Sequence, residues 1–257
     1  DGSHGEELWA HETTNDSTWQ VADINSGGSS YPSQMTVMGT RLLFTATDGS
    51  HGVELWAHES TNDSTWQVAD ILSGYLGGLY FTSEFTVMGT QLYFEARKSE
   101  YNYELWAYDT TNDSTWEVID RRGTLGGFAQ HITAMGTRLY FEAYEDTTGY
   151  RLWAYETTND SAWQVDITSG SQANDITVIG TRLYFEANDG STGMELWTHE
   201  TTNDSTWQVA DINSGGSGYA KQMTVMGTRL FFRATDGSTG MELWAHETTN
   251  DSTWQVA

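Results

Sequence analysis

The sequence contains no cysteine, a single proline and only two lysines. Without cysteine there are no disulfides, no thiolate zinc sites and no thiol nucleophile. Lysine and arginine together number 11 against 36 acidic residues, which gives a formal net charge of −25. Such a surface repels phosphates, so we expect no nucleic-acid partner. No apolar run of about 18 residues occurs, so we also expect no membrane insertion.

Aromatic residues and glycine, in contrast, are plentiful, with 12 Trp, 13 Tyr, 9 Phe and 26 Gly. Large rings build a core from few side chains, and frequent glycine is typical of many tight turns. The acidic surplus has two explanations: a solvated surface suited to salty water, or carboxylate clusters that bind Ca²⁺. The chain starts at Asp1, inside a repeat, and we expect it to be processed or partial.

Two short motifs recur along the whole chain. The stretch Thr-Thr-Asn-Asp-Ser-Thr-Trp, including two variants, appears six times. Leu-Trp pairs end at Trp9, Trp56, Trp106, Trp153, Trp197 and Trp244, with spacings of 47, 50, 47, 44 and 47 residues. A period of this length suits the four-stranded blade of a β-propeller, which takes about 40–50 residues.

Each repeat is predicted to form four short strands. In the last repeat, residues 222–227, 228–235, 241–248 and 252–257 alternate apolar and polar side chains and are rich in aromatic and β-branched residues. We therefore predict an all-β fold, a single β-propeller over residues 1–257 with four-stranded antiparallel blades. A half-blade leads (1–22), and five full blades follow at 33–69, 83–119, 130–166, 174–210 and 221–257.

The half-blade leaves the closure of the ring open. If the ring has five blades, the half-blade lies outside it. If the ring has six blades, the half-blade lacks its first hairpin, which residues before Asp1 could supply. Otherwise the open edge pairs with another chain, because an unpaired strand edge is a template for association.

The stretch DGSHGVELWAHESTNDSTWQVADILSG from Asp48, with SQMTVMGTRLLFTATDGSHG before it, resembles the ELWxxDGT repeat of secreted bacterial proteins. The resemblance covers essentially the whole chain. One departure is regular, because Glu-Thr-Thr or Asp-Thr-Thr, as at residues 109–111, replaces Asp-Gly-Thr. The resemblance implies a propeller at the cell surface or outside the cell. A weaker likeness is to kelch-type blades.

Two pairs of loops with nearly identical sequences are the candidate binding sites. In a propeller, the loops between blades and the loops between the second and third strands share one face. Asp23, Asn25 and Asp48 are therefore predicted to form one cluster, and Asp211, Asn213 and Asp236 form its twin.

These clusters have three interpretations. Their oxygens suit a sugar stacked on Tyr31 or Tyr219. They also suit Ca²⁺ as a cofactor, held by Asp23, Asp48, Asp211 and Asp236. Alternatively, the aspartates cap their own loop amides, an interpretation that we favour for Asp23 and its equivalents. Asp48 and Asp236 are the better ligand candidates.

The recurring Asn-Asp-Ser turn is also an Asn-x-Ser glycosylation acceptor. The candidate asparagines are Asn15, Asn62, Asn112, Asn159, Asn203 and Asn250. The alternative is a hairpin turn that uses Asn and Asp only for their local hydrogen bonds.

Histidines at one third-strand position (His11, His58, His199 and His246) are replaced by Tyr108 and Tyr155 in the other two repeats. Tyrosine keeps the ring and discards the metal-binding nitrogen, so we interpret this position as surface or as packing between blades, and not as a zinc site.

No nucleophile elbow, P-loop or HExxH motif is present. The most divergent loops contribute Tyr80, Arg97, Lys98, Arg121 and Arg122, which form no recognisable catalytic set. We therefore expect a non-enzymatic, extracellular or cell-surface propeller that binds carbohydrate at several blades or mediates adhesion. The alternatives are a building block of a surface layer or filament, with other copies of itself as partners, and a glycoside-acting enzyme.

Overall fold

The computed structural model describes residues 5–81, 83–100, 102–119, 129–145, 149–165, 167 and 173–256. Every regular element within these ranges is a β-strand. No helix of the described chain is therefore long and apolar enough to cross a membrane. The predicted all-β fold of four-stranded antiparallel blades is confirmed.

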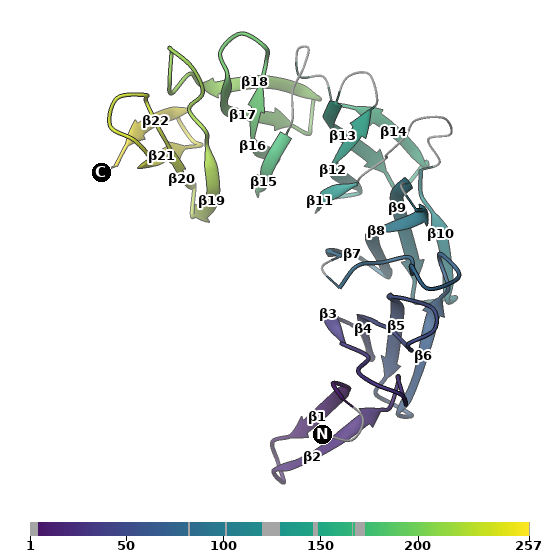
Figure 1. Cartoon of the computed structure of the whole chain (residues 1–257). Helices are drawn as coiled ribbons and strands as arrows, with labels where there is room; N and C mark the ends of the chain where they lie inside the picture. Colours follow the sequence, from purple (N-terminus) through teal and green to yellow (C-terminus); the bar gives the residue numbers. More distant parts are fainter. Residues whose placement is uncertain are drawn as a thin grey trace. The chain divides into compact units, whose positions relative to one another are not determined.

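Five four-stranded sheets follow one two-stranded sheet (Figure 1). The half-blade consists of β1 (Leu8–Glu12) and β2 (Ser17–Ala22). Blade 1 consists of β3 (Ser33–Met38), β4 (Arg41–Ala46), β5 (Glu54–Glu59) and β6 (Ser64–Ala69). Blade 2 consists of β7 (Phe85–Met88), β8 (Gln91–Ser99), β9 (Asn102–Asp109) and β10 (Ser114–Glu117).

The remaining three blades repeat this order. Blade 3 consists of β11 (Gln130–Met135), β12 (Arg138–Glu145), β13 (Gly149–Glu156) and β14 (Ser161–Gln164). Blade 4 consists of β15 (Ala173–Ile179), β16 (Arg182–Asn188), β17 (Met194–Glu200) and β18 (Ser205–Ala210). Blade 5 consists of β19 (Lys221–Met226), β20 (Arg229–Ala234), β21 (Glu242–Glu247) and β22 (Ser252–Gln255).

The chain divides into two compact units, residues 1–132 and 133–257. In each sheet, strands that are consecutive in sequence are hydrogen-bonded neighbours.

The recurring Asn-Asp-Ser turn closes the hairpin between the third and fourth strands of each sheet. In the half-blade, Asn15 Oδ1 accepts hydrogen bonds from the backbone N–H and the hydroxyl of Ser17 (3.1 and 2.6 Å). The next residue, Asp16, has a left-handed φ of 57°. Aspartate tolerates this region better than most residues do, which explains the choice of residue. The same φ, between 52° and 59°, recurs at Asp63, Asp113, Asp160, Asp204 and Asp251.

The glutamate of the Glu-Leu-Trp motif binds the loop that leads to the next blade. Glu195 accepts hydrogen bonds from the backbone N–H groups of Ile212 (2.8 Å) and Gly218 (2.7 Å). Glu54 makes the same pair of contacts with Ile71 and Gly78. Burial raises the pKa of each of these carboxyls to about 7, although the backbone donors act in the opposite direction. The motif therefore fixes the position of the loop.

The core lies between successive blades. In the first unit, Leu55 of blade 1 packs with Phe94 of blade 2. In the second unit, Leu196 of blade 4 packs with Phe232 of blade 5. Within each unit, apolar side chains of successive blades therefore pack against each other.

An ion pair reinforces these contacts, and we call it the arginine staple. Arg182, the first residue of β16, lies 5.2 Å from the ring centre of Trp207 and 3.4 Å from Glu200, both in its own blade. Its Nη1 also donates to Asp251 Oδ1 of blade 5 (2.8 Å). Equivalent staples join Arg138 to Asp204 (2.8 Å) and Arg41 to Asp113 (2.5 Å).

Candidate ligand-binding site

The predicted loop clusters are only partly assembled. Asn25 lies against Gly49, where an added Cβ atom would be 2.9 Å from Asn25 Oδ1, and Asn213 lies against Gly237 in the same way. However, both amides are used within their own loops. Asn25 Nδ2 donates to Ser29 O (2.9 Å), and Asn213 Nδ2 donates to Ser217 O (3.0 Å).

The capping hydrogen bonds are made by Asp48 and Asp236, for which we did not favour capping. Ligand binding by these two residues stays a prediction. Asp48 caps its own loop, because its Oδ1 accepts from the N–H groups of Ser50 and His51 (2.8 and 2.9 Å). Although burial acts to raise it, the pKa of Asp48 is lowered, because His51 and Ser50 donate hydrogen bonds to the carboxylate. Asp236 likewise accepts from the N–H group of Ser238 (2.8 Å).

Asp23 and Asp211, for which capping was favoured, are exposed at the starts of their loops. The amides of the first loop are bound instead by Glu7, which accepts from Ile24 N–H (2.9 Å), and by Asn25. Within the described part of the chain, no group of three or more His, Asp or Glu side chains could hold a metal ion. The Ca²⁺ hypothesis stays a prediction.

Tyr31 and Tyr219 are exposed, as sugar stacking would require, and both have a left-handed φ (50° and 53°). Tyr31 lies edge-on to Phe81 with ring centres 5.7 Å apart, and both line a cavity of about 450 Å³. Lys221 Nζ lies 5.9 Å from the ring centre of Tyr219. Carbohydrate binding at either ring stays a prediction.

All six candidate glycosylation asparagines lie on exposed hairpin turns, as predicted. In each turn the Asn Oδ1 accepts hydrogen bonds from the following serine. These contacts explain the sequence of the turn in structural terms, and glycosylation stays a prediction.

The third-strand histidines of the second unit pack between blades, as predicted. His199 lies 5.6 Å from the ring of Tyr140, and His246 lies 5.4 Å from the ring of Tyr184. Burial lowers the pKa of both imidazoles.

The divergent cationic residues are engaged in local contacts. Arg97 lies 4.5 Å from the ring centre of Tyr80 and 5.5 Å from that of Tyr103. Lys98 forms an ion pair with Glu117 at 2.8 Å. Arg121 and Arg122 lie outside the described residues, as do the loop aspartates Asp120 and Asp166.

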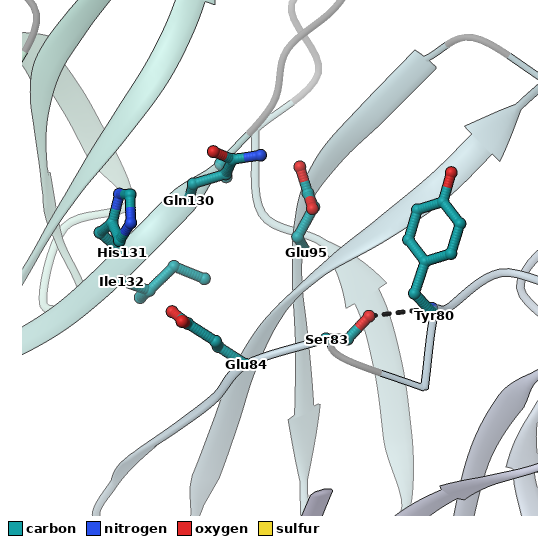
Figure 2. Close-up of a pocket in the computed structure, with 8 residues that line it drawn as sticks. Tyr80, Ser83, Glu84, Glu95, Gln130, His131 and Ile132 are labelled. Carbon is teal, nitrogen blue, oxygen red and sulfur yellow. Dashed lines mark hydrogen bonds between the residues drawn. The ribbon is translucent and has the colours of Figure 1, made fainter. Parts of the chain in front are cut away.

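A different site lies within the first unit, where the ends of β7, β8 and β11 meet. Its cavity of about 250 Å³ is lined by Tyr80, Ser83, Glu84, Glu95, Ala129, Gln130, His131 and Ile132. Figure 2 shows Glu95 and Gln130 facing the same space, with Tyr80 beyond them. Tyr80 N–H donates to Ser83 Oγ (2.9 Å), which holds the segment before β7 in place. His131 has a left-handed φ of 53°.

The electrostatics of this cavity are set by two carboxylates. Burial raises the pKa of Glu95 to about 7; a hydrogen bond from the Ala129 backbone acts against this rise, and the negative charge of Glu84 adds to it. Glu95 Oε1 is inaccessible to solvent and has no hydrogen-bond partner. Both carboxylate oxygens of Glu186, the equivalent glutamate of blade 4, also lack a hydrogen-bond partner, so this feature is common to the two glutamates.

The equivalent glutamate of blade 4 has a lysine beside it. Glu186 lies 3.6 Å from Lys221 Nζ, the first residue of the next blade. Gln130 occupies the position of Lys221 beside Glu95. None of the described lysines and arginines forms an ion pair with Glu95, so among the described residues nothing corresponds to Lys221 at this cavity.

Sequence reasoning missed Glu84, Glu95, Gln130 and His131. The signal was present in the repeats, because aligning the strands pairs Glu95 with Glu186 and Gln130 with Lys221. That these two positions meet across blades is visible only in the structure.

The fold defines the protein as a β-propeller, a class to which similar solved structures belong. The chain is similar to puromycin hydrolase, with 13% identity and a TM-score of 0.56 over 87% of this chain and 37% of that one. It is also similar to oligopeptidase B from Leishmania major, with 11% identity and a TM-score of 0.57 over 88% of this chain and 33% of that one. A third similar structure is an oligogalacturonate lyase in complex with manganese, with 12% identity and a TM-score of 0.55 over 89% of this chain and 65% of that one.

At these identities the likeness shows the fold, and the chain spans about a third to two thirds of the length of these proteins. No family model matches the chain, and no curated protein matches it. Likeness to the ELWxxDGT repeat therefore stays a prediction. The expectation that the chain functions as an adhesion or multivalent binding module is wrong, because the similar structures are propellers of peptidases and a lyase. Whether the chain is an enzyme and whether it binds carbohydrate stay predictions.

Proposed function

We propose that this chain is a substrate-handling propeller domain of a peptide-processing system, and that its acidic cavity holds a cationic group of the ligand. The observation that carries the proposal is the acidic lining around Glu95, a half-buried glutamate that shares the cavity with Glu84 and has no described lysine or arginine beside it. Its counterpart Glu186 has Lys221 within 3.6 Å, so a ligand cation beside Glu95 would complete an arrangement that the protein already contains.

The charge around the cavity favours a cation. Glu84 and Glu95 both line it, and the described lining contains no lysine or arginine. A cation placed between them would lower the pKa of Glu95 towards its ordinary value, and the resulting ion pair would stabilise the complex.

The size of the cavity favours a small group. A volume of about 250 Å³ falls below the usual range of about 300–1,000 Å³ for whole drug-sized ligands. One guanidinium or ammonium side chain fits this space better than an oligosaccharide does. Tyr80 and Ile132 offer apolar surface for the stem of such a side chain.

Similar structures suggest the class of ligand. They include a puromycin hydrolase, an oligopeptidase B and a prolyl oligopeptidase B bound to a 35mer hydrolysis and macrocyclization substrate. We therefore propose an arginine- or lysine-bearing peptide, and we assign binding but no bond-breaking step to this chain. A location outside the cytoplasm belongs to the same proposal and is supported by the resemblance to secreted repeats.

Calorimetric titration with N-acetyl-arginine amide tests this function. We expect saturable binding, and we expect Glu95→Gln to weaken it at least about tenfold, which corresponds to 1.4 kcal/mol. Affinity should rise between pH 6 and pH 8, because a cation binds the ionised form of Glu95, whose pKa is about 7.

Glu186→Gln is the matched control, since it removes the same charge from the equivalent position of blade 4, where Lys221 of the next blade lies 3.6 Å away. Its affinity should equal that of the wild type. The neutral citrulline analogue should bind at least about tenfold more weakly than the arginine amide. Equal affinities for wild type and Glu95→Gln, or no binding by the wild type, would remove the cavity from the function.

A further inference from the structure

Arg97, in β8, is a buried arginine that forms an ion pair with no carboxylate of the described residues. Only 8% of it is exposed, and its Nη1 donates to the backbone oxygen of Leu76 (3.3 Å). The arginines that begin the second strands, in contrast, each pair with a glutamate of their own blade (Arg41, Arg138, Arg182 and Arg229). Burying a charge costs free energy unless the charge is paired. An anion near Arg97 would therefore offset part of that cost.

Two tyrosine rings hold the guanidinium of Arg97, and we call these three residues the Arg97 cluster. The guanidinium lies 4.5 Å from the ring centre of Tyr80 and 5.5 Å from that of Tyr103. The two rings stack with their centres 5.7 Å apart, and their hydroxyl groups are hydrogen-bonded to each other. The residues equivalent to Arg97 in the other four full blades carry no charge (Thr47, Tyr144, Asn188 and Thr235). This position is therefore cationic in blade 2 alone.

The Arg97 cluster adjoins the acidic cavity of the same unit. Tyr80 lines that cavity, and Figure 2 shows its ring on the side of Glu95 away from Gln130. Glu95 and Arg97 are two residues apart in β8 and pair with Leu105 and Tyr103 of β9. They therefore lie on one face of the strand, about 6.8 Å apart along it. Arg97 is not among the described lining residues, so Tyr80 is the residue that connects the cluster with the cavity.

The hydrogen bonds of the cluster run in a direction that suits an anion. Burial and the Tyr80 hydroxyl raise the pKa of Tyr103, and Arg97 opposes this rise through its charge and a hydrogen bond. A guanidinium can only donate hydrogen bonds, so Arg97 donates to Tyr103. When Tyr103 in turn donates to Tyr80, the hydroxyl proton of Tyr80 is left for a ligand. Tyr80 is 44% exposed, against 7% for Tyr103, so a ligand can reach it.

We propose that the Arg97 cluster binds the C-terminal carboxylate of a peptide whose last residue places its cationic side chain beside Glu95. The Tyr80 hydroxyl donates to the carboxylate. Arg97 and Tyr103 are positioning residues, because they fix the ring of Tyr80 and the charge of Arg97 polarises the chain of hydrogen bonds.

The short spacing identifies the source of the carboxylate. Because Glu95 and Arg97 are only about 6.8 Å apart along β8, both charges of the ligand belong to one residue, a C-terminal arginine or lysine. This inference rests on the proposed function, since it takes the bound cation as given, and it narrows the ligand to peptides that end in a basic residue.

Calorimetric titration with N-acetyl-arginine, which has a free carboxylate, and with its neutral amide tests the inference. We expect the wild type to bind N-acetyl-arginine at least about tenfold more tightly than the amide. The net charge of −25 acts against this preference, so the preference requires a local cation. Arg97→Met and Tyr80→Phe should each lower the ratio of the two affinities at least about fivefold. Arg97→Lys retains the charge and should keep a higher ratio than Arg97→Met.

Lys98→Met is the matched control. It removes the same charge from the next residue of β8, whose side chain pairs with Glu117 (2.8 Å), so the ratio of the two affinities should stay that of the wild type. A drop in that ratio as large as the drop in Arg97→Met would overturn the role of Arg97.

The two proposals fail in different ways. If the wild type binds the amide and shows no preference for N-acetyl-arginine, this inference is overturned and the proposed function stands. If the wild type binds neither ligand, both are overturned. The α-amide of N-acetyl-arginyl-aspartic acid carries its only carboxylate on the following side chain, and it should bind more weakly than N-acetyl-arginine. Tighter binding of that peptide would overturn the C-terminal source of the carboxylate.

Discussion

Truncation of Trp197 to alanine is expected to lower the free energy of unfolding by about 3–5 kcal/mol, and the same truncation at Trp9 by less than about 1 kcal/mol. Both residues are the tryptophan of a Leu-Trp pair. Trp197 is 7% exposed and packs in the core of the second unit, whereas Trp9 is 43% exposed. Trp197 Nε1 has no hydrogen-bond partner, so apolar packing carries its contribution.

Guanidinium unfolding followed by circular dichroism measures both costs on the same scale. The comparison holds residue type and motif constant and changes only burial. Costs that are equal for the two variants would mean that the indoles are not packed between blades as described.

The second large effect concerns a glycine in the loop between β4 and β5. Gly52 has a φ of +74°, and an added Cβ would lie 2.3 Å from Gly77 N in the loop that leads to blade 2. Gly52→Ala is therefore expected to cost about 3 kcal/mol, since it combines left-handed strain with a backbone clash. The glycine is required because the two loops touch.

Gly240, at the equivalent position of blade 5, is the control for this change. Its φ is +95°, but an added Cβ would meet nothing within 4 Å. Gly240→Ala should cost only the backbone strain, about 1 kcal/mol. Thermal and denaturant unfolding of both variants gives the difference, and a cost for Gly52→Ala no larger than that for Gly240→Ala would contradict the described loop contact.

The strands and turns could be predicted because their causes are local. Alternating side chains and the Asn-Asp-Ser turn act over a few residues, and repetition made them visible six times. The roles of Asp23 and Asp48 could not be assigned in this way. The residue that binds the first loop is Glu7, 17 residues before Ile24, and that distance in sequence hides the contact.

The candidate site was missed for a related reason. Glu95 lies in β8 and Gln130 in β11, and neither residue is unusual in its own strand. Only their meeting between blades shows that no described residue beside Glu95 corresponds to Lys221, which lies beside Glu186. The repeated sequence contained the comparison, but the three-dimensional pairing was needed to interpret it.

The most direct test of the proposed function is the pKa of Glu95, measured from its carboxyl ¹³C chemical shift with and without N-acetyl-arginine amide. We predict a pKa of about 7 in the free protein, because the carboxyl is buried beside Glu84. Saturating ligand should lower it, because a bound cation stabilises the ionised form. A Glu95 pKa that the ligand leaves unmoved would contradict the assignment of this cavity as a cation-binding site.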